Sequence, residues 1–183
     1  MRLRLNQIGY IANKIALDLY NSSLLALKVP LETIAKTAKE VLELDIKEEI
    51  AIDQKSQELL EKNQQEVEFL RIDERKLFGM IKRQIAEEKR FLLFWDDRYN
   101  ALSHKILDIL IQKQYIQFSV NKNQVKNIIF KAIDSFAKIH DSIQEEVVAK
   151  IKTYKRKILV GTDEYELIYD KLYEEELRKK GFA

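Results

Sequence analysis

The sequence predicts an almost entirely α-helical, elongated protein, and three observations carry this prediction. The 183 residues include only 4 glycines and 1 proline, whereas average usage of the two together is roughly 12%. Tight turns depend on these residues, so we expect few turns and no hairpin-rich β fold. Charged residues make up 34% and hydrophobic residues 46% of the chain, which indicates long helices with solvated faces rather than disorder. Apolar residues also recur at helical spacing through most of the sequence.

The first half of the chain predicts a short helix, a very long helix and a second short helix. Residues 8–19 carry the apolar face of the first helix, and a short apolar segment, Leu24–Val29, follows. Pro30 is tolerated at the first position of a helix, and no breaker appears between it and about Arg71. Asp73 can cap the third helix, whose inner face is Phe78, Ile81 and Ile85.

The second half predicts the same order of elements. Asp96–Asp97 are candidate caps of a helix to residue 110, and Tyr115–Val120 reads as a short extended piece. Asn121 or Asn123 can cap a long helix that continues to about Ile158. Gly161 and Thr162 then indicate a stop and restart, and Glu166 is expected to complete a capping box on Asp163 at the start of the final helix.

An internal repeat follows from sliding the chain against itself by 91 positions. Identical residues then coincide, and so do apolar positions such as Ile34 with Val125. The identities include Lys14-Ile15 with Lys105-Ile106, Leu19 with Leu110 and Val29 with Val120. We therefore predict two helical repeats, 1–91 and 92–183, each short–very long–short, packed together through a shared bundle.

Helix length predicts the shape. A helix of about 40 residues is roughly 60 Å long, whereas a compact chain of this length would be roughly 40 Å across. We expect an elongated molecule in which both long helices and both short C-terminal helices form a four-helix bundle base. Each first helix would cover the start of its own long helix, so that two helical arms project from the base. A pseudo-twofold axis would relate the two repeats.

Several segments spread over nearly the whole chain resemble a bacterial family known only as a domain of unknown function, the one numbered five hundred and seven. They are Tyr10–Leu19, Asp73–Arg75, Asn123–Ile129, Tyr154–Lys157 and Lys171–Leu177. The resemblance implies no activity, cofactor or functional residue, because the family has none assigned.

The composition excludes some environments and chemistries. The chain has no cysteine, so disulfides, thiolate metal sites and cysteine nucleophiles are excluded. The N-terminal residues Met1–Leu5 lack the apolar core of a signal peptide. The longest apolar run, Phe91–Trp95, is far shorter than the roughly 18 residues of a membrane span. We expect a cytoplasmic protein with no membrane partner.

No pattern in the sequence predicts catalysis. Neither of the two histidines, His104 and His140, stands in a Glu-x-x-His or His-Glu-x-x-His motif, and we expect structural or surface roles for both. The glycines are too scattered for a phosphate-binding loop or a nucleophile elbow. We interpret the run Glu174–Glu176 as a solvated face. We expect no catalytic residues, metal, cofactor or small-molecule substrate, and we predict that the protein is not an enzyme.

Charge is divided unevenly between the two long helices. Residues 31–70 hold 11 acidic and 5 basic side chains, whereas residues 121–160 hold 4 acidic and 9 basic ones. The end of the second long helix is the most basic part, with Lys150, Lys152, Lys155, Arg156 and Lys157. These five residues could contact nucleic-acid phosphates or a partner. We favour the alternatives that they complement the helix C-terminus or that the acidic and basic long helices pair in the bundle.

The run Phe91–Trp95 joins the two halves. It could form an exposed docking patch, but we favour the interpretation that it seals the base of the bundle. An elongated helical protein without a catalytic pattern is best suited to gripping a protein partner or to forming a homodimer. We predict a non-enzymatic protein-interaction or adaptor module, with nucleic-acid binding through the basic second long helix as the alternative.

Overall fold

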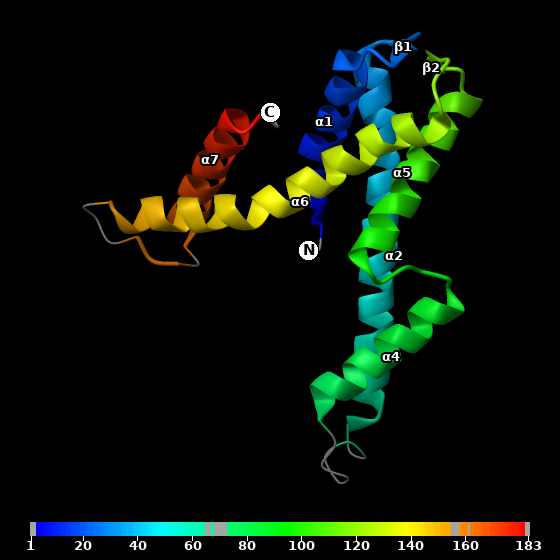
Figure 1. Cartoon of the computed structure of the whole chain (residues 1–183). Helices are drawn as coiled ribbons and strands as arrows, with labels where there is room; N and C mark the ends of the chain where they lie inside the picture. The colour runs from blue at the N-terminus through cyan, green and yellow to red at the C-terminus, as the bar shows by residue number, and fades with distance from the viewer. Residues whose placement is uncertain (1–2, 65–66, 68–72, 155–157, 161, 182–183) are drawn as a thin grey trace.

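The computed structural model of the chain describes residues 3–64, 67, 73–154, 158–160 and 162–181. Within these residues the protein forms six α-helices, one short 3-10 helix and one two-stranded sheet (Figure 1). This confirms the prediction of a mostly helical protein. The elements are η1 (Leu5–Gln7), α1 (Ile8–Asn21), β1 (Leu25–Leu27), α2 (Leu31–Lys62), α4 (Glu74–Glu88), α5 (Trp95–Gln112), β2 (Ile116–Phe118), α6 (Lys122–Lys152) and α7 (Asp163–Lys179).

The sheet joins the two halves of the chain at one end of the molecule. Strands β1 and β2 pair antiparallel, with Ala26 opposite Gln117 at the centre of the ladder. The amide of Lys28 also donates a 2.8 Å hydrogen bond to the carbonyl of Tyr115, which extends the pairing by one step. The apolar segment and the extended piece expected from the sequence are therefore the two partners of one small sheet.

The base of the molecule is built from the first short helix and the first part of the long helix of each half. Helix α1 packs against α2 and α6, and α5 packs against α6 and α2, so the four helices contact one another in a closed ring. Their shared core is apolar and fully buried, and includes Ile11, Ile15, Ile106, Ile129 and Phe136. The prediction that the short C-terminal helices complete this base is wrong.

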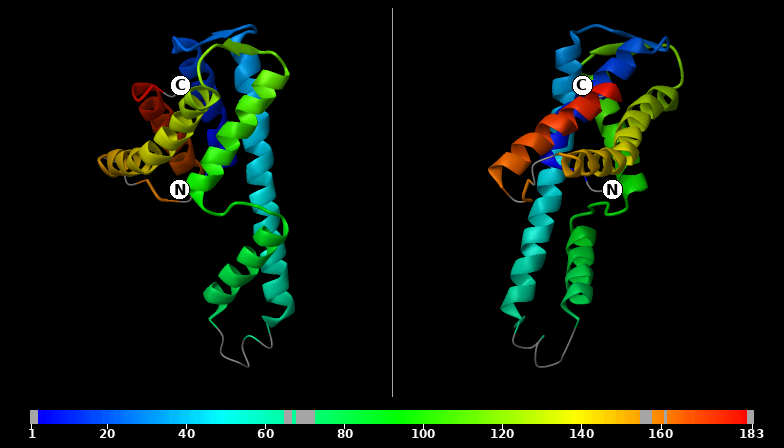
Figure 2. Two further views of the ribbon diagram at one scale, coloured as in Figure 1. Left: turned by 45° about the vertical axis from the view of Figure 1, so that its right-hand side comes forward. Right: turned by 90° about the vertical axis from the view of Figure 1, so that its left-hand side faces the viewer.

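The short C-terminal helices instead form the two arms. The main contacts of α4 are with α2, and those of α7 are with α6 (Figure 2). Figure 1 shows the α2–α4 arm pointing downward and the α6–α7 arm pointing to the left. In the first arm, Ile52, Ile85 and Ala86 make an apolar cluster separate from the main core, whereas Tyr173 and Leu177 of the second arm belong to the main core.

Two helices end without glycine, which explains how the chain folds with so few. Arg90 after α4 and Gln114 after α5 both adopt the left-handed conformation, with φ of 55° and 56°. The next amides, those of Phe91 and Tyr115, donate to carbonyls five residues earlier at 2.8 and 2.9 Å. This is the hydrogen bond of a Schellman ending, which glycine usually supplies.

Two predicted caps are confirmed. The Asp73 carboxylate accepts hydrogen bonds from the amides of Arg75 and Lys76 at 3.0 and 3.3 Å. The Asn121 side chain accepts one from the amide of Asn123 at 2.9 Å. Both side chains satisfy amides of the first helical turn that have no partner within the helix.

Two other predicted caps are wrong. Helix α5 begins at Trp95 with Phe94 at the capping position, so Asp96–Asp97 lie within the first turn, where their charge favours the helix dipole. Helix α7 is capped by Thr162, whose hydroxyl accepts from the amide of Tyr165 at 3.2 Å. Asp163 is the first helical residue, so the capping residue is Thr162 and not Asp163 as predicted.

Both long helices end earlier than predicted. Helix α2 stops at Lys62, where the Asn63 side chain donates a 2.7 Å hydrogen bond to the carbonyl of Leu59. Helix α6 stops at Lys152, where the Thr153 hydroxyl donates a 2.6 Å bond to the carbonyl of Lys150. These side chains satisfy carbonyls that the next helical turn would otherwise bind. Each long helix is still close to 50 Å in length.

Candidate functional site

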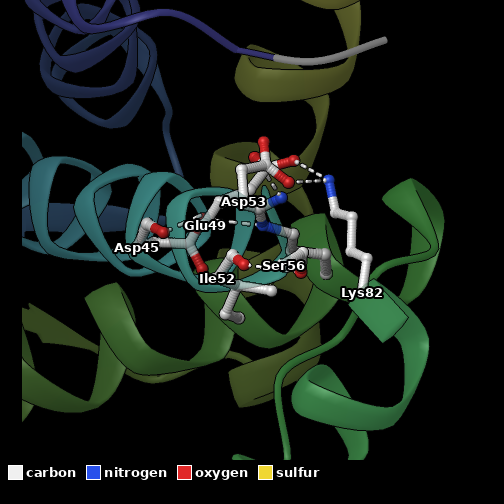
Figure 3. A network of polar contacts seen from close by, with 7 residues as sticks. Asp45, Glu49, Ile52, Asp53, Ser56 and Lys82 are labelled. Atoms are coloured by element: carbon white, nitrogen blue, oxygen red, sulfur yellow. Dashed lines mark hydrogen bonds and ion pairs between the residues drawn. The ribbon is translucent and has the colours of Figure 1, made fainter. Parts of the chain in front are cut away.

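The joint of the first arm is a row of acidic side chains on α2 that meets two cations from other helices. Asp45, Glu49 and Asp53 are spaced four residues apart and so lie on one face of α2. Arg98 of α5 contacts Asp45 through Nε at 2.7 Å and Glu49 through Nη1 at 2.9 Å. Lys82 of α4 contacts Asp53 at 2.7 Å and Glu49 at 3.4 Å (Figure 3). The joint therefore links three helices through charge.

Because the charges of this joint are buried, its stability depends strongly on their ion pairs. Glu49 and Arg98 are each only 3% exposed. The rings of Phe91 and Trp95 cover the guanidinium, with centroids 4.5 and 5.2 Å from Cζ. Burial raises the pKa of the Asp45 carboxyl above its usual value, and the hydrogen bond from Arg98 opposes this shift. A charge left here without its partner would be costly.

The joint of the second arm is also buried, but it is built from an amide, an imidazole, a phenol and further aromatic rings. The side-chain nitrogen of Gln7 lies 2.9 Å from Nε2 of His140, and the Tyr173 hydroxyl contacts Nδ1 of the same ring. Phe136 stacks on His140, and Tyr169 stacks on Tyr173, each pair with centroids 6.0 Å apart. Burial raises the pKa of Tyr173 well above its usual value, so its hydroxyl keeps its proton at neutral pH.

A constant sequence separation relates residues of the two joints. Three polar residues of the first joint are each separated by 91 positions from a polar residue of the second. The pairs are Gln7 with Arg98, Glu49 with His140, and Lys82 with Tyr173. The two joints are built from different residue types, so identical residues do not reveal this separation. Sequence reasoning missed both joints for this reason.

The predicted basic residues have different environments. Lys150 forms an ion pair with Glu176 of α7, which also contacts Lys179 at 2.7 Å. The hydrogen bonds from these two lysines lower the pKa of Glu176 from 4.5 to about 2. Lys152 is exposed to solvent, and the remaining three predicted residues (Lys155, Arg156 and Lys157) lie outside the described residues. Lys150 therefore fastens α7 to α6.

The ion pairs of the two arms correct the predictions for two acidic segments. Glu176 is 4% exposed, so the solvated face expected for Glu174–Glu176 is wrong at this residue. The acidic row of α2 pairs with Arg98 and Lys82, from α5 and α4. These side chains of α2 therefore pair with α5 and α4, whereas the sequence predicted that they would pair with the basic long helix.

An apolar pocket lies near the end of the second arm. It has a volume of about 240 Å³, and most of its lining is apolar. Two of its lining residues, Tyr154 and Val160, are 43% and 80% exposed, and Leu159, which precedes Val160, is 62% exposed. The signal in the sequence was the apolar triplet Ile158–Val160 directly after the basic run. The lining residues are Val148, Ile151, Lys152, Tyr154, Ile158, Val160 and Tyr165.

The first arm also has a pocket, with different chemistry. It measures about 260 Å³ and is lined by Gln57, Leu60, Glu61, Gln64, Val67 and Glu74. Five of these positions are 91 residues before lining positions of the other pocket, namely 57, 60, 61, 67 and 74. Glu61 corresponds to Lys152 and Glu74 to Tyr165. The two arm ends therefore offer hollows of similar size with opposite charge.

The segment Phe91–Trp95 connects the two halves, and its residues are alternately packed against the protein and exposed to solvent. Phe91 and Leu93 pack on the apolar cluster of the first arm, and Trp95 packs on the main core. Phe94 is 81% and Leu92 43% exposed. The prediction that this run covers buried apolar surface agrees with the packing of Phe91, Leu93 and Trp95. It does not agree with the exposure of Leu92 and Phe94.

The described residues include no candidate metal site. No group of three or more His, Cys, Asp or Glu side chains among them is placed to hold a metal ion. His104 is half-buried on α5, and His140 belongs to the second joint. None of the helices in the described part of the chain is both long enough and apolar enough to cross a membrane.

Comparison with known proteins completes the description of the chain. No curated protein matches the sequence. A family model described as a protein of unknown function, DUF507, matches residues 1–182. Because this match covers almost the whole chain, the protein belongs to the DUF507 family.

Proposed function

We propose that this protein is a non-enzymatic protein-interaction module whose arms bind partner proteins. The observation that carries the proposal is the apolar pocket of the second arm together with the exposure of Tyr154, Leu159 and Val160. Burying these side chains against a partner is favourable, and exposed apolar clusters on a folded protein commonly mark interaction sites.

The arrangement of the arms supports the same proposal. Each arm is two helices thick and projects from a base that holds most of the apolar core (Figure 2). A partner can therefore bury surface on an arm without disturbing the base. The buried joints fasten each arm to its base, so the arm ends are presented at defined positions.

We further propose that the two halves are repeats related by a pseudo-twofold axis. Seven buried residues at the start of the first half, Gln7, Ile8, Ile11, Ala12, Ile15, Ala16 and Leu19, have buried counterparts 91 positions later. The central strand pair, Ala26 and Gln117, has the same separation. An antiparallel strand pair whose two strands come from equivalent places has a local twofold axis between them. The corresponding joints and arm-end pockets support the same relation.

A matched pair of leucines allows the interaction proposal to be tested. Leu159 is 62% exposed at the end of the second arm, and Leu44 is 61% exposed on α2. The tagged full chain, Leu159→Asp and Leu44→Asp are each used to capture partners from the native cells, with and without nuclease. We expect a stoichiometric protein that survives nuclease and is lost with Leu159→Asp but retained by Leu44→Asp.

Nucleic-acid binding through the basic end of α6 is the alternative that the same experiment addresses. Lys152 is exposed, whereas Lys150 is engaged with Glu176. Retained DNA or RNA, with all captured proteins lost after nuclease, would reverse the order of the two proposals. Binding that falls steeply with salt would be the accompanying sign.

A further inference from the structure

We propose that the pocket of the second arm binds one large apolar side chain of a partner peptide whose neighbouring residues are acidic. This inference rests on the proposed interaction function and adds the site and the chemistry of the partner.

The lining determines what the pocket accepts. Four lining residues are aliphatic and two are tyrosines, and the seventh is Lys152; the aliphatic ones are Val148, Ile151, Ile158 and Val160. The volume of about 240 Å³ is below the range of about 300–1,000 Å³ typical of pockets for drug-sized ligands. A single Leu, Phe or Met side chain suits a hollow of this size, because its burial removes apolar surface from water on both partners.

The charge at the pocket determines which partner residues are favourable next to the bound apolar side chain. Among the described lining residues, Lys152 is the charged one, and it is exposed. It lies in a region, residues 121–160, with five more basic than acidic residues. Glu164 and Glu166 flank Tyr165 in sequence. Adjacent side chains on a helix point about 100° apart, so these two carboxylates do not point in the same direction as the Tyr165 ring. An acidic residue on the partner is therefore complementary to the pocket, and a basic one is not.

The first arm indicates that this chemistry is specific to the second arm. At the corresponding positions, Gln57 stands for Val148, Glu61 for Lys152 and Glu74 for Tyr165. An apolar side chain flanked by acids would meet like charge and a more polar lining there. The concave pocket also favours a peptide side chain over an anionic lipid surface, because apolar groups that insert into a bilayer need to protrude.

The test is a selection of random peptides displayed on phage against the immobilised full chain. The enriched peptide is then synthesised, and its affinity is measured by fluorescence polarisation. The variants are Val160→Asp and Lys152→Glu, with Glu61→Lys at the corresponding position of the first arm as the matched control. All three side chains are exposed, so circular dichroism is expected to show wild-type helix content for each variant.

We expect a consensus with one large apolar residue and Asp or Glu within two positions of it. Val160→Asp and Lys152→Glu should each weaken binding about tenfold or more, and Glu61→Lys should leave it unchanged within about twofold. A basic consensus, or no enriched peptide, would overturn the inference. So would binding of anionic phosphatidylserine vesicles that depends on Val160 and Lys152 when no peptide binds.

The outcomes separate this inference from the proposed function. A peptide whose affinity is unaffected by both pocket substitutions overturns the pocket assignment and leaves the interaction function standing. The interaction function fails separately, if capture from cells retains only nucleic acid and proteins that nuclease releases.

Discussion

Arg98 of α5 and Glu49 of α2 form an ion pair in which both side chains are almost completely buried, with Nη1 and Oε2 2.9 Å apart. The pair lies where the first arm leaves the base, and Lys82 of α4 reaches the same carboxylate. The position of an entire arm therefore depends on charges that have been removed from water.

Glu49→Ala tests this dependence. The substitution leaves the Arg98 guanidinium buried with one of its two carboxylate partners removed, and we expect the free energy of unfolding to fall by about 3–5 kcal/mol. Urea denaturation followed by circular dichroism measures the change. Lys39→Ala, which removes one partner of the exposed pair with Glu43, should cost less than about 1 kcal/mol. Equal losses in the two variants would contradict the role of burial.

Exchanging one joint for the other tests the repeat. If the joints are equivalent, the triple variant Gln7→Arg, His140→Glu, Tyr173→Lys places the ionic set of the first joint into the second. We expect His140→Glu alone to destabilise the protein more than the triple variant does, because the single change buries a charge without a cation beside it. Thermal denaturation of both variants provides the comparison, and a triple variant that is less stable than the single one argues against equivalence.

Removing the Tyr173 hydroxyl tests the second joint. Tyr173→Phe keeps the ring in its stack with Tyr169 but removes a hydrogen-bond partner of the buried His140. We expect a loss of about 1–3 kcal/mol in the free energy of unfolding. Tyr20→Phe, at a tyrosine that is 62% exposed, should cost much less. Ultraviolet titration should also show that Tyr173→Phe removes a tyrosine that ionises well above pH 10.

Acid should weaken the attachment of the second arm. The pKa of Glu176 is about 2 in the folded protein and 4.5 ordinarily. A carboxyl whose pKa is lower in the folded state stabilises that state above its unfolded pKa, and the contribution is lost as pH falls from about 4.5 to 2. Stability measured by urea denaturation between pH 6 and pH 3 should therefore fall less in Glu176→Gln than in the wild type. Glu166→Gln, an exposed change on the same helix, should keep the wild-type profile.

The helices and their buried faces could be predicted because they depend on local information. Ile8, Ile11 and Ile15 repeat at the period of a helix, and all three are fully buried in α1. Asp73 and Asn121 cap their helices because a short polar side chain before an apolar run satisfies the first amides. Asp163 was wrong because Thr162, directly before it, is the capping residue, whereas Asp96–Asp97 were wrong because α5 already begins at Trp95 with the apolar Phe94 at the capping position.

The sequence by itself determined the helical class, the order of the helices and the short extended piece at Tyr115–Val120. Only the tertiary structure decided that α1 and α5, rather than α4 and α7, complete the base, and that Glu49 meets Arg98 while Glu176 meets Lys150. Burial of an apolar face is favourable against any complementary apolar surface, so periodicity shows which side of a helix is buried without naming its partner. Ion pairs and hydrogen bonds are directional and short-ranged, so they form only after packing has brought together residues far apart in the chain.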